Sequence, residues 1–150
     1  MFRDKRLLAI FICLGLLFVG TAIQAGDFPE MITMKQDYEH KKGIVEFSHG
    51  KHFREYKIGC GECHHDDKGE PLNDLKEGDP VQSCFECHSK PGERPKGKDA
   101  PKLSKKERLE YHAEALHYNC IDCHKDYNKK NKTKAAPATC KKCHPKTEKN

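Results

Sequence analysis

Apolar residues are concentrated at the start of the chain. A run of 13 residues, 7–19, is apolar except for Gly15. It follows a stretch with three basic residues and one acidic residue, and it precedes 21–25, which ends on the small residue Ala25. These three parts are typical of a secretory signal peptide, and the run falls short of the roughly 20 residues of a membrane span. We therefore predict that residues 1–25 are a cleaved signal peptide, the alternative being an uncleaved N-terminal anchor.

After residue 25 the pattern predicts short elements between long polar segments. Residues 31–34 and 44–47 contain β-branched and other apolar residues that favour two strands of a small hairpin. Segments 66–80 and 89–102 are rich in Gly, Pro and charged residues and predict exposed loops, and 125–139 predicts a lysine-rich connector.

One longer helix is predicted between the second loop and this connector. Ser104 and Glu107 have the three-residue spacing of a capping box. Beyond them Leu109, Ala113 and Leu116 recur at helical spacing. The predicted helix therefore begins after Ser104 and continues to about Tyr118.

Composition excludes an ordinary apolar core. The 125 residues after residue 25 include 36 hydrophobic residues, of which 8 are cysteines, so only 28 are ordinary apolar residues. Such a composition favours disorder or a framework held by disulfides or metal. It argues against a large α/β enzyme or a β-sandwich, and something other than apolar side chains must fill the interior.

All eight cysteines after residue 25 belong to one repeated motif, Cys-x-x-Cys-His. The four copies are Cys60-Gly-Glu-Cys63-His64, Cys84-Phe-Glu-Cys87-His88, Cys120-Ile-Asp-Cys123-His124 and Cys140-Lys-Lys-Cys143-His144. This is the attachment motif of haem c: two thiols form thioethers with the porphyrin vinyl groups, and the adjacent histidine binds the iron. Disulfides, structural zinc and a redox dithiol are the alternatives, but none needs a histidine at this offset four times. We predict four covalently bound haem c groups, which form the core. The ninth cysteine, Cys13, lies in the apolar run and is expected to be lost with the signal peptide.

Six further histidines decide between an electron carrier and an enzyme. They are His40, His49, His52, His65, His112 and His117. A haem iron with two histidine ligands has no open position and only passes electrons, whereas an iron lacking the second ligand can bind and activate small molecules. Since four second ligands are needed and six histidines exist, we expect a carrier and no catalytic residues. A multihaem reductase with an open iron is the rival hypothesis.

From residue 31 to residue 144 the chain resembles the tetrahaem class III cytochromes c, the cytochrome c3 family. The resemblance rests on Val45-Glu-Phe47-Ser-His49-Gly-Lys-His52, on the doubled histidine His64-His65, on the order of the four motifs and on His117-Tyr-Asn-Cys120. It implies a mostly irregular fold with a few short helices and a short N-terminal two-stranded hairpin, wrapped around four haems, over residues 26–150. All four motifs here have two-residue spacers, whereas some members of the family have wider second and fourth motifs.

The resemblance also implies the second iron ligands. In this map His49 pairs with His64, His65 with His88, His52 with His124, and His117 with His144. For the last pair, His112 is the alternative to His117 and is otherwise a surface or second-shell residue. His40 lies in a charged stretch and is expected to be solvated.

Charge is polarised along the chain. Residues 26–100 carry 12 basic and 16 acidic residues, and residues 101–150 carry 13 basic and 6 acidic residues. The basic C-terminal face, defined as Lys125, Lys129, Lys130, Lys132, Lys134, Lys141, Lys142 and Lys146, flanks the last two motifs. It predicts docking of an acidic redox partner, the alternative being a solvated surface. Because export is predicted, nucleic acid is not an expected partner.

The function implied by the resemblance is a low-potential periplasmic electron carrier of anaerobic respiration, often sulfate respiration. Implied partners are a periplasmic hydrogenase or formate dehydrogenase and a membrane redox complex. We expect a monomer without stable membrane insertion after processing. A dedicated haem subunit of a membrane complex is the alternative context.

Overall fold

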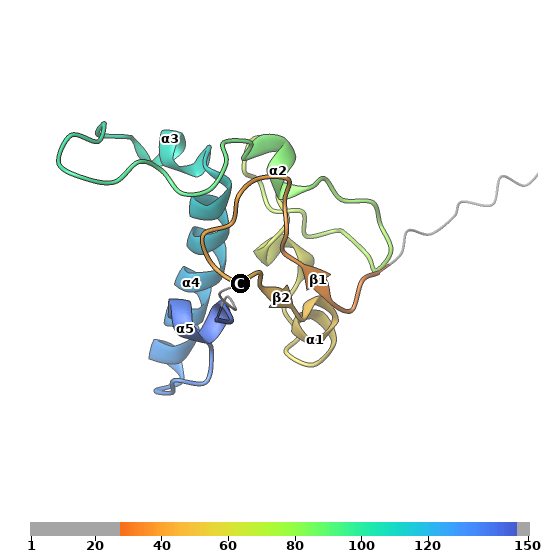
Figure 1. Cartoon of the computed structure of the whole chain (residues 1–150). Helices are drawn as coiled ribbons and strands as arrows, with labels where there is room; N and C mark the ends of the chain where they lie inside the picture. The colour runs from red at the N-terminus through yellow and green to blue at the C-terminus, as the bar shows by residue number, and fades with distance from the viewer. Residues whose placement is uncertain (1–27, 147–150) are drawn as a thin grey trace, which may run out of the picture.

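The computed structural model describes residues 28–146. The predicted signal peptide and Cys13 lie outside these residues. Figure 1 shows one long helix, α4, along one side of the chain, with the small sheet and α1 on the other side and α5 next to the lower part of α4. The loop between α2 and α3 projects away from the other elements.

The predicted hairpin is present and shorter than expected. Strands β1 (Ile32–Thr33) and β2 (Glu46–Phe47) pair antiparallel, with Ile32 opposite Phe47. The Thr33 hydroxyl donates to the Glu46 carboxylate across the pair at 2.8 Å. Two strands of two residues cannot be stable alone, so the hairpin depends on its packing against the rest of the chain.

Three of the four Cys-x-x-Cys strings fold as a single helical turn. They form η1 (Cys60–Glu62), α2 (Cys84–Cys87) and α5 (Cys140–Cys143). A spacing of three residues places two side chains on the same face of a helical turn, so both thiols of a motif can reach one flat group. Helix α1 (His49–Arg54) is also short and carries two of the histidines outside the motifs.

The predicted helix from Ser104 to Tyr118 is wrong in its boundaries, because two helices occupy the region. Helix α3 (Lys105–Leu109) begins at the predicted capping box, which is confirmed, and α4 (His112–Lys130) follows. Between them the chain pairs with Lys90, whose amide donates to the Glu110 carbonyl and whose carbonyl accepts from the His112 amide. These bonds replace the intrahelical ones and divide the helix.

The predicted connector over 125–139 is also wrong at its start. Helix α4 continues through the third motif to Lys130, because the spacing of Cys120 and Cys123 suits a helix and no breaker occurs before Pro137. The long helix thus contains a whole motif.

Side chains contribute almost nothing to an interior. Within residues 28–146, Ala115 is the only buried apolar side chain, and His112, 2% exposed, is the only buried polar one. The predicted fold class, a mostly irregular chain with a few short helices and an N-terminal hairpin, is confirmed.

The last motif is in contact with the segment before β2. The Gly43 carbonyl lies 2.8 Å from Nδ1 of His144, and a Cβ on Gly43 would clash with the backbone of Pro145. Glycine is therefore required at 43 for close packing, and the last motif is held against the segment before β2.

Candidate functional site

Each motif histidine faces a histidine from elsewhere in the chain. The ring centroids lie 6.2 Å apart for His49 and His64, 5.8 Å for His65 and His88, 6.2 Å for His52 and His124, and 6.1 Å for His117 and His144. An imidazole nitrogen binds a metal at about 2.0 Å and lies about 1.1 Å from its ring centre, so two rings on one metal have centres about 6 Å apart. The spacing of all four pairs therefore fits a metal held between two histidines.

Hydrogen bonds orient these rings. In six of the eight histidines Nδ1 faces a backbone carbonyl at 2.5–3.0 Å: His49 at Pro29, His52 at Ser48, His65 at Asp66, His88 at Leu109, His124 at Pro137 and His144 at Gly43. Because a carbonyl can only accept, Nδ1 carries the proton in each of these rings. The lone pair is then on Nε2, which is free to bind a metal.

Short stretches of backbone connect the pairs to one another. His64 and His65 are consecutive, and α1 carries both His49 and His52. Helix α4 carries His117 and His124, seven residues apart and therefore on one face, about 10 Å apart along the axis. Since neighbouring residues serve different pairs, the four pairs must lie close together.

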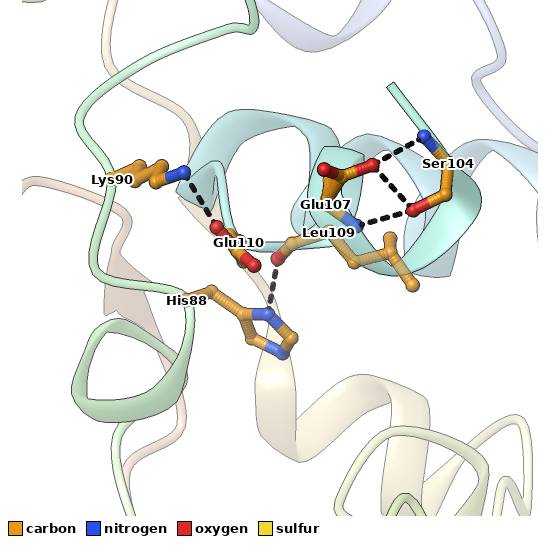
Figure 2. A network of polar contacts seen from close by, with 6 residues as sticks. All are labelled: His88, Lys90, Ser104, Glu107, Leu109 and Glu110. Carbon is orange, nitrogen blue, oxygen red and sulfur yellow. Dashed lines mark hydrogen bonds and ion pairs between the residues drawn. The ribbon is translucent and has the colours of Figure 1, made fainter.

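Figure 2 shows how the histidine of the second motif is held. His88 Nδ1 donates to the carbonyl of Leu109 at the end of α3. The start of α3 is fixed by the reciprocal bonds of Ser104 and Glu107, and Lys90 forms an ion pair with Glu110 at 2.6 Å. The short helix is thus fixed at both ends and provides a firm acceptor for the His88 ring.

Burial raises the pKa of several of the motif thiols. All eight are free of disulfide bonds in the part of the chain that the structure describes. Burial raises the pKa of the Cys120 thiol to about 11, with added effects from the nearby Cys63, Cys143 and Cys84. Burial also raises the pKa of Cys63, with Cys123 adding to it. A redox dithiol needs a lowered thiol pKa, so the raised values at Cys120 and Cys63 argue against that alternative. Cysteines of all four motifs lie near one another.

His112 and His40 belong to an aromatic cluster and not to a pair. The Tyr38 hydroxyl lies 2.9 Å from His112 Nδ1 and forms a hydrogen bond with it, and the His112 ring packs edge-on against Phe85 with centroids 5.2 Å apart. Burial lowers the pKa of His112, with His88 and His40 adding to the shift. Of the two positions expected for His112 apart from ligation, surface or second-shell, the surface position is wrong, since the residue is only 2% exposed.

The expectation of a solvated His40 is wrong as well. Its ring stacks on Tyr38 with centroids 4.6 Å apart, and its Nε2 lies 3.0 Å from the Gln36 carbonyl. The cluster ties the segment after β1 to α2 and α4. The sequence signal that could have indicated it is the aromatic and histidine spacing of Tyr38 and His40, although nothing in it points to Phe85 or His112.

We expect Tyr38→Phe to lower the free energy of unfolding of the holoprotein by about 1–2 kcal/mol. The change leaves the buried Nδ1 of His112 without a partner, which costs more than the net value of the bond. Tyr127→Phe is the matched control, because that side chain is 53% exposed. Denaturant titration measures both variants, and equal losses in the two would contradict the role assigned to the cluster.

The sequence model of the Class III cytochrome C family matches residues 28–144, which include all four motifs and all eight paired histidines. The chain belongs to the class III cytochrome c family. A class III cytochrome c contains covalently bound haem c and carries electrons. No curated protein matches the chain with significant similarity. Within residues 28–146, no helix has the length and apolar character that crossing a membrane would need.

The residues of this class III cytochrome c fit haem c. Each motif places two cysteines on one helical turn or, in α4, on one helix face, with a histidine directly after them. Each of these histidines has a second ring about 6 Å away, with the spacing of two axial ligands. The thiols supply the covalent attachment and the ring nitrogens supply iron ligands.

Sequence reasoning missed the groups that orient the rings. The carbonyls of Leu109, Pro137 and Gly43 have no sequence signal, because every residue has a carbonyl. Glu93 was also missed. Its carboxylate lies 3.7 Å from Nδ1 of His117, across a loop whose path cannot be inferred from composition.

Proposed function

We propose that this class III cytochrome c is a periplasmic carrier with four haem c groups, in which each iron has two histidine ligands. The observation that supports it best is the set of four ring pairs, each of which joins a motif histidine to a histidine outside the four motifs. One of these partners, His65, directly follows the first motif and pairs with the histidine of the second. Two nitrogen ligands leave no position for a substrate. The chain is therefore proposed to pass electrons and not to catalyse a reaction at iron.

The eight cysteines would hold the haems by thioether bonds, and the eight paired histidines would bind the irons. When bound, haem c supplies a one-electron couple between ferric and ferrous iron. The carbonyl partners keep each ring in one orientation and keep the proton on Nδ1, so no proton has to leave the ring when charge changes.

The shared backbone suggests an order for electron transfer. Consecutive histidines 64 and 65 join the second haem to the first, α1 joins the first to the third, and α4 joins the third to the fourth. We propose exchange in the order second, first, third and fourth haem. The connecting stretches are one to seven residues long, so each transfer covers a short distance.

The proposed partners follow from charge and from the family. The lysines of the basic C-terminal face belong to α4, to α5 and to the segments that follow these two helices, and Lys141 and Lys142 lie within the fourth motif. We propose that it docks an acidic partner, such as a periplasmic hydrogenase or formate dehydrogenase, and that a membrane redox complex exchanges electrons with the carrier. Export through residues 1–25, which lie outside the described chain, and a role in anaerobic respiration belong to the same proposal.

The test of this function is the spectrum of the purified holoprotein together with its mass. We expect a mass equal to residues 26–150 plus four haems, low-spin iron throughout, and no change in the reduced spectrum with carbon monoxide. The ring planes of His52 and His124 are 25° apart, while the other pairs are 70–90° apart. Parallel rings act on the same iron orbital, so one rhombic and three strongly anisotropic EPR signals are expected. A high-spin signal or rapid binding of carbon monoxide would instead indicate an open iron and favour the reductase.

We expect reduction by a periplasmic hydrogenase to slow as ionic strength rises. Attraction between a basic face and an acidic partner is screened over about 10 Å at 0.1 M salt. In low salt, the double variant Lys141→Glu and Lys142→Glu should reduce the rate by about tenfold or more. The control Lys68→Glu and Lys76→Glu has the same net charge but lies in the 66–80 loop. Stopped-flow rates that are flat with salt, or equal in both variants, would exclude docking at this face.

A further inference from the structure

His117 differs from the other paired histidines in the group that faces its Nδ1. Six of them face neutral backbone carbonyls, and for His64 no such hydrogen bond forms within residues 28–146. His117 instead faces a carboxylate, because Oε1 of Glu93 lies 3.7 Å from its Nδ1. At this distance the carboxylate is in contact with the ring N–H, although the separation is slightly too long for a hydrogen bond. The ring proposed as second ligand of the fourth haem is thus the one with an anionic neighbour.

The backbone around Glu93 is held in place. The Gly92 carbonyl accepts from the amide of Ala113 at 3.0 Å, and Ala113 lies one helical turn before His117 on α4. The preceding Lys90 is bonded in both directions to the chain between α3 and α4. These backbone hydrogen bonds fix the chain next to Glu93, so its side chain starts from a defined backbone position close to the His117 ring.

Two basic side chains near His117 form ion pairs with carboxylates. Lys96 donates to Glu93 at 2.8 Å, and Arg94 lies 3.7 Å from the carboxylate of Glu114. The ammonium of Lys96 at this distance favours the charged form of the Glu93 carboxylate. The positive charge of Lys96 partly neutralises the Glu93 carboxylate and so weakens its effect on His117. Without Lys96, the negative charge of Glu93 would act more strongly on the His117 ring.

We propose that Glu93 is a positioning residue that orients His117 and lowers the reduction potential of the haem attached to Cys140 and Cys143. The inference rests on the proposed ligation of that haem by His117. A carboxylate beside Nδ1 makes the imidazole a stronger donor and stabilises ferric over ferrous iron. With haem bound, reduction would transfer one electron from the redox partner to the iron, no bond would break, and the Nδ1 proton would stay on the His117 ring.

The test uses three variants of the holoprotein in which one charge changes. We expect Glu93→Gln to raise one of the four potentials and leave the other three within error. Lys96→Gln should shift the same potential in the opposite direction. Glu77→Gln is the matched control: it removes a carboxylate paired with a basic side chain, Arg54, at similar exposure, 45% against 46%, but its carboxylate forms no contact with a paired histidine. Glu93→Asp should restore part of the wild-type value.

Potentials are measured by redox titration followed by NMR of the haem methyl resonances, which assigns each potential to a haem. If Glu93→Gln shifts no potential, shifts a different haem, or shifts all four equally, the inference is overturned. Low-spin iron in both wild type and variant, without carbon monoxide binding, shows that the ligation itself stands in that case. If the wild type already has an open fourth iron, the ligation fails first and the inference fails with it.

Discussion

Replacing His117 by alanine is expected to convert one of the four haems from low-spin to high-spin iron. The variant loses the ring that lies 6.1 Å from His144, so that iron has one protein ligand and an open position. We expect reduced protein to bind one carbon monoxide per chain, and three quarters of the iron to remain low-spin. EPR of the oxidised protein and titration with carbon monoxide measure the two effects.

His112→Gln is the matched control, because His112 lies on the same helix and was the alternative ligand. Its Nδ1 is bonded to Tyr38, and its ring packs on Phe85. We expect this variant to keep four low-spin haems and to lose only stability. If it becomes high-spin while His117→Ala does not, the assignment of the fourth pair is wrong.

Removing both thiols of the third motif, by Cys120→Ala and Cys123→Ala, is expected to lower the haem content from four to three per chain. These cysteines lie within α4, which also carries His117 and His124, so under the proposed attachment the loss would remove a large apolar group next to the longest helix. Because Ala115 is the only buried apolar side chain of the described residues, no protein core compensates. We therefore expect little folded protein to accumulate, and the mass and iron content of what remains to show one haem fewer.

The ninth cysteine offers the control for this experiment. Cys13→Ser changes a thiol in the predicted signal peptide, outside the four motifs and outside the described residues. We expect the same haem content, mass and yield as in the wild type. Four haems in the Cys120 and Cys123 variant would contradict attachment at the third motif, and a lower mass of the mature Cys13→Ser protein would place Cys13 in the mature chain.

The local elements with a sequence signal were predicted well. The capping box at Ser104 and Glu107 and the hairpin at β1 and β2 depend on neighbouring residues, and both are present. The division between α3 and α4 was not predictable, because it comes from backbone bonds to Lys90, twenty residues earlier in the chain. The extension of α4 to Lys130 differs from the predicted connector because a lysine-rich composition does not distinguish a connector from a helix, and lysine is a good helix former.

For the histidines, too, the sequence predicts some features, whereas others depend on contacts between residues far apart in the chain. The pairing of His49 with His64 and of His52 with His124 followed from a resemblance, and the ring spacings agree with that map. The environment of His112 did not follow, since a buried histidine and a surface histidine have the same local sequence. Which ring meets which, and which ring meets a carbonyl, depends on contacts over as many as 101 residues.

The sequence alone determined the chemistry of this cytochrome. Four Cys-x-x-Cys-His strings and a deficit of apolar residues predict haem attachment and a cofactor that fills the interior, because both are properties of residue type and short spacing. Only the tertiary structure decided how the rings are oriented, that His112 serves packing, and that Glu93 faces His117. Those features are relations between distant backbone segments, and their free energies depend on distance and direction, which composition and periodicity do not contain.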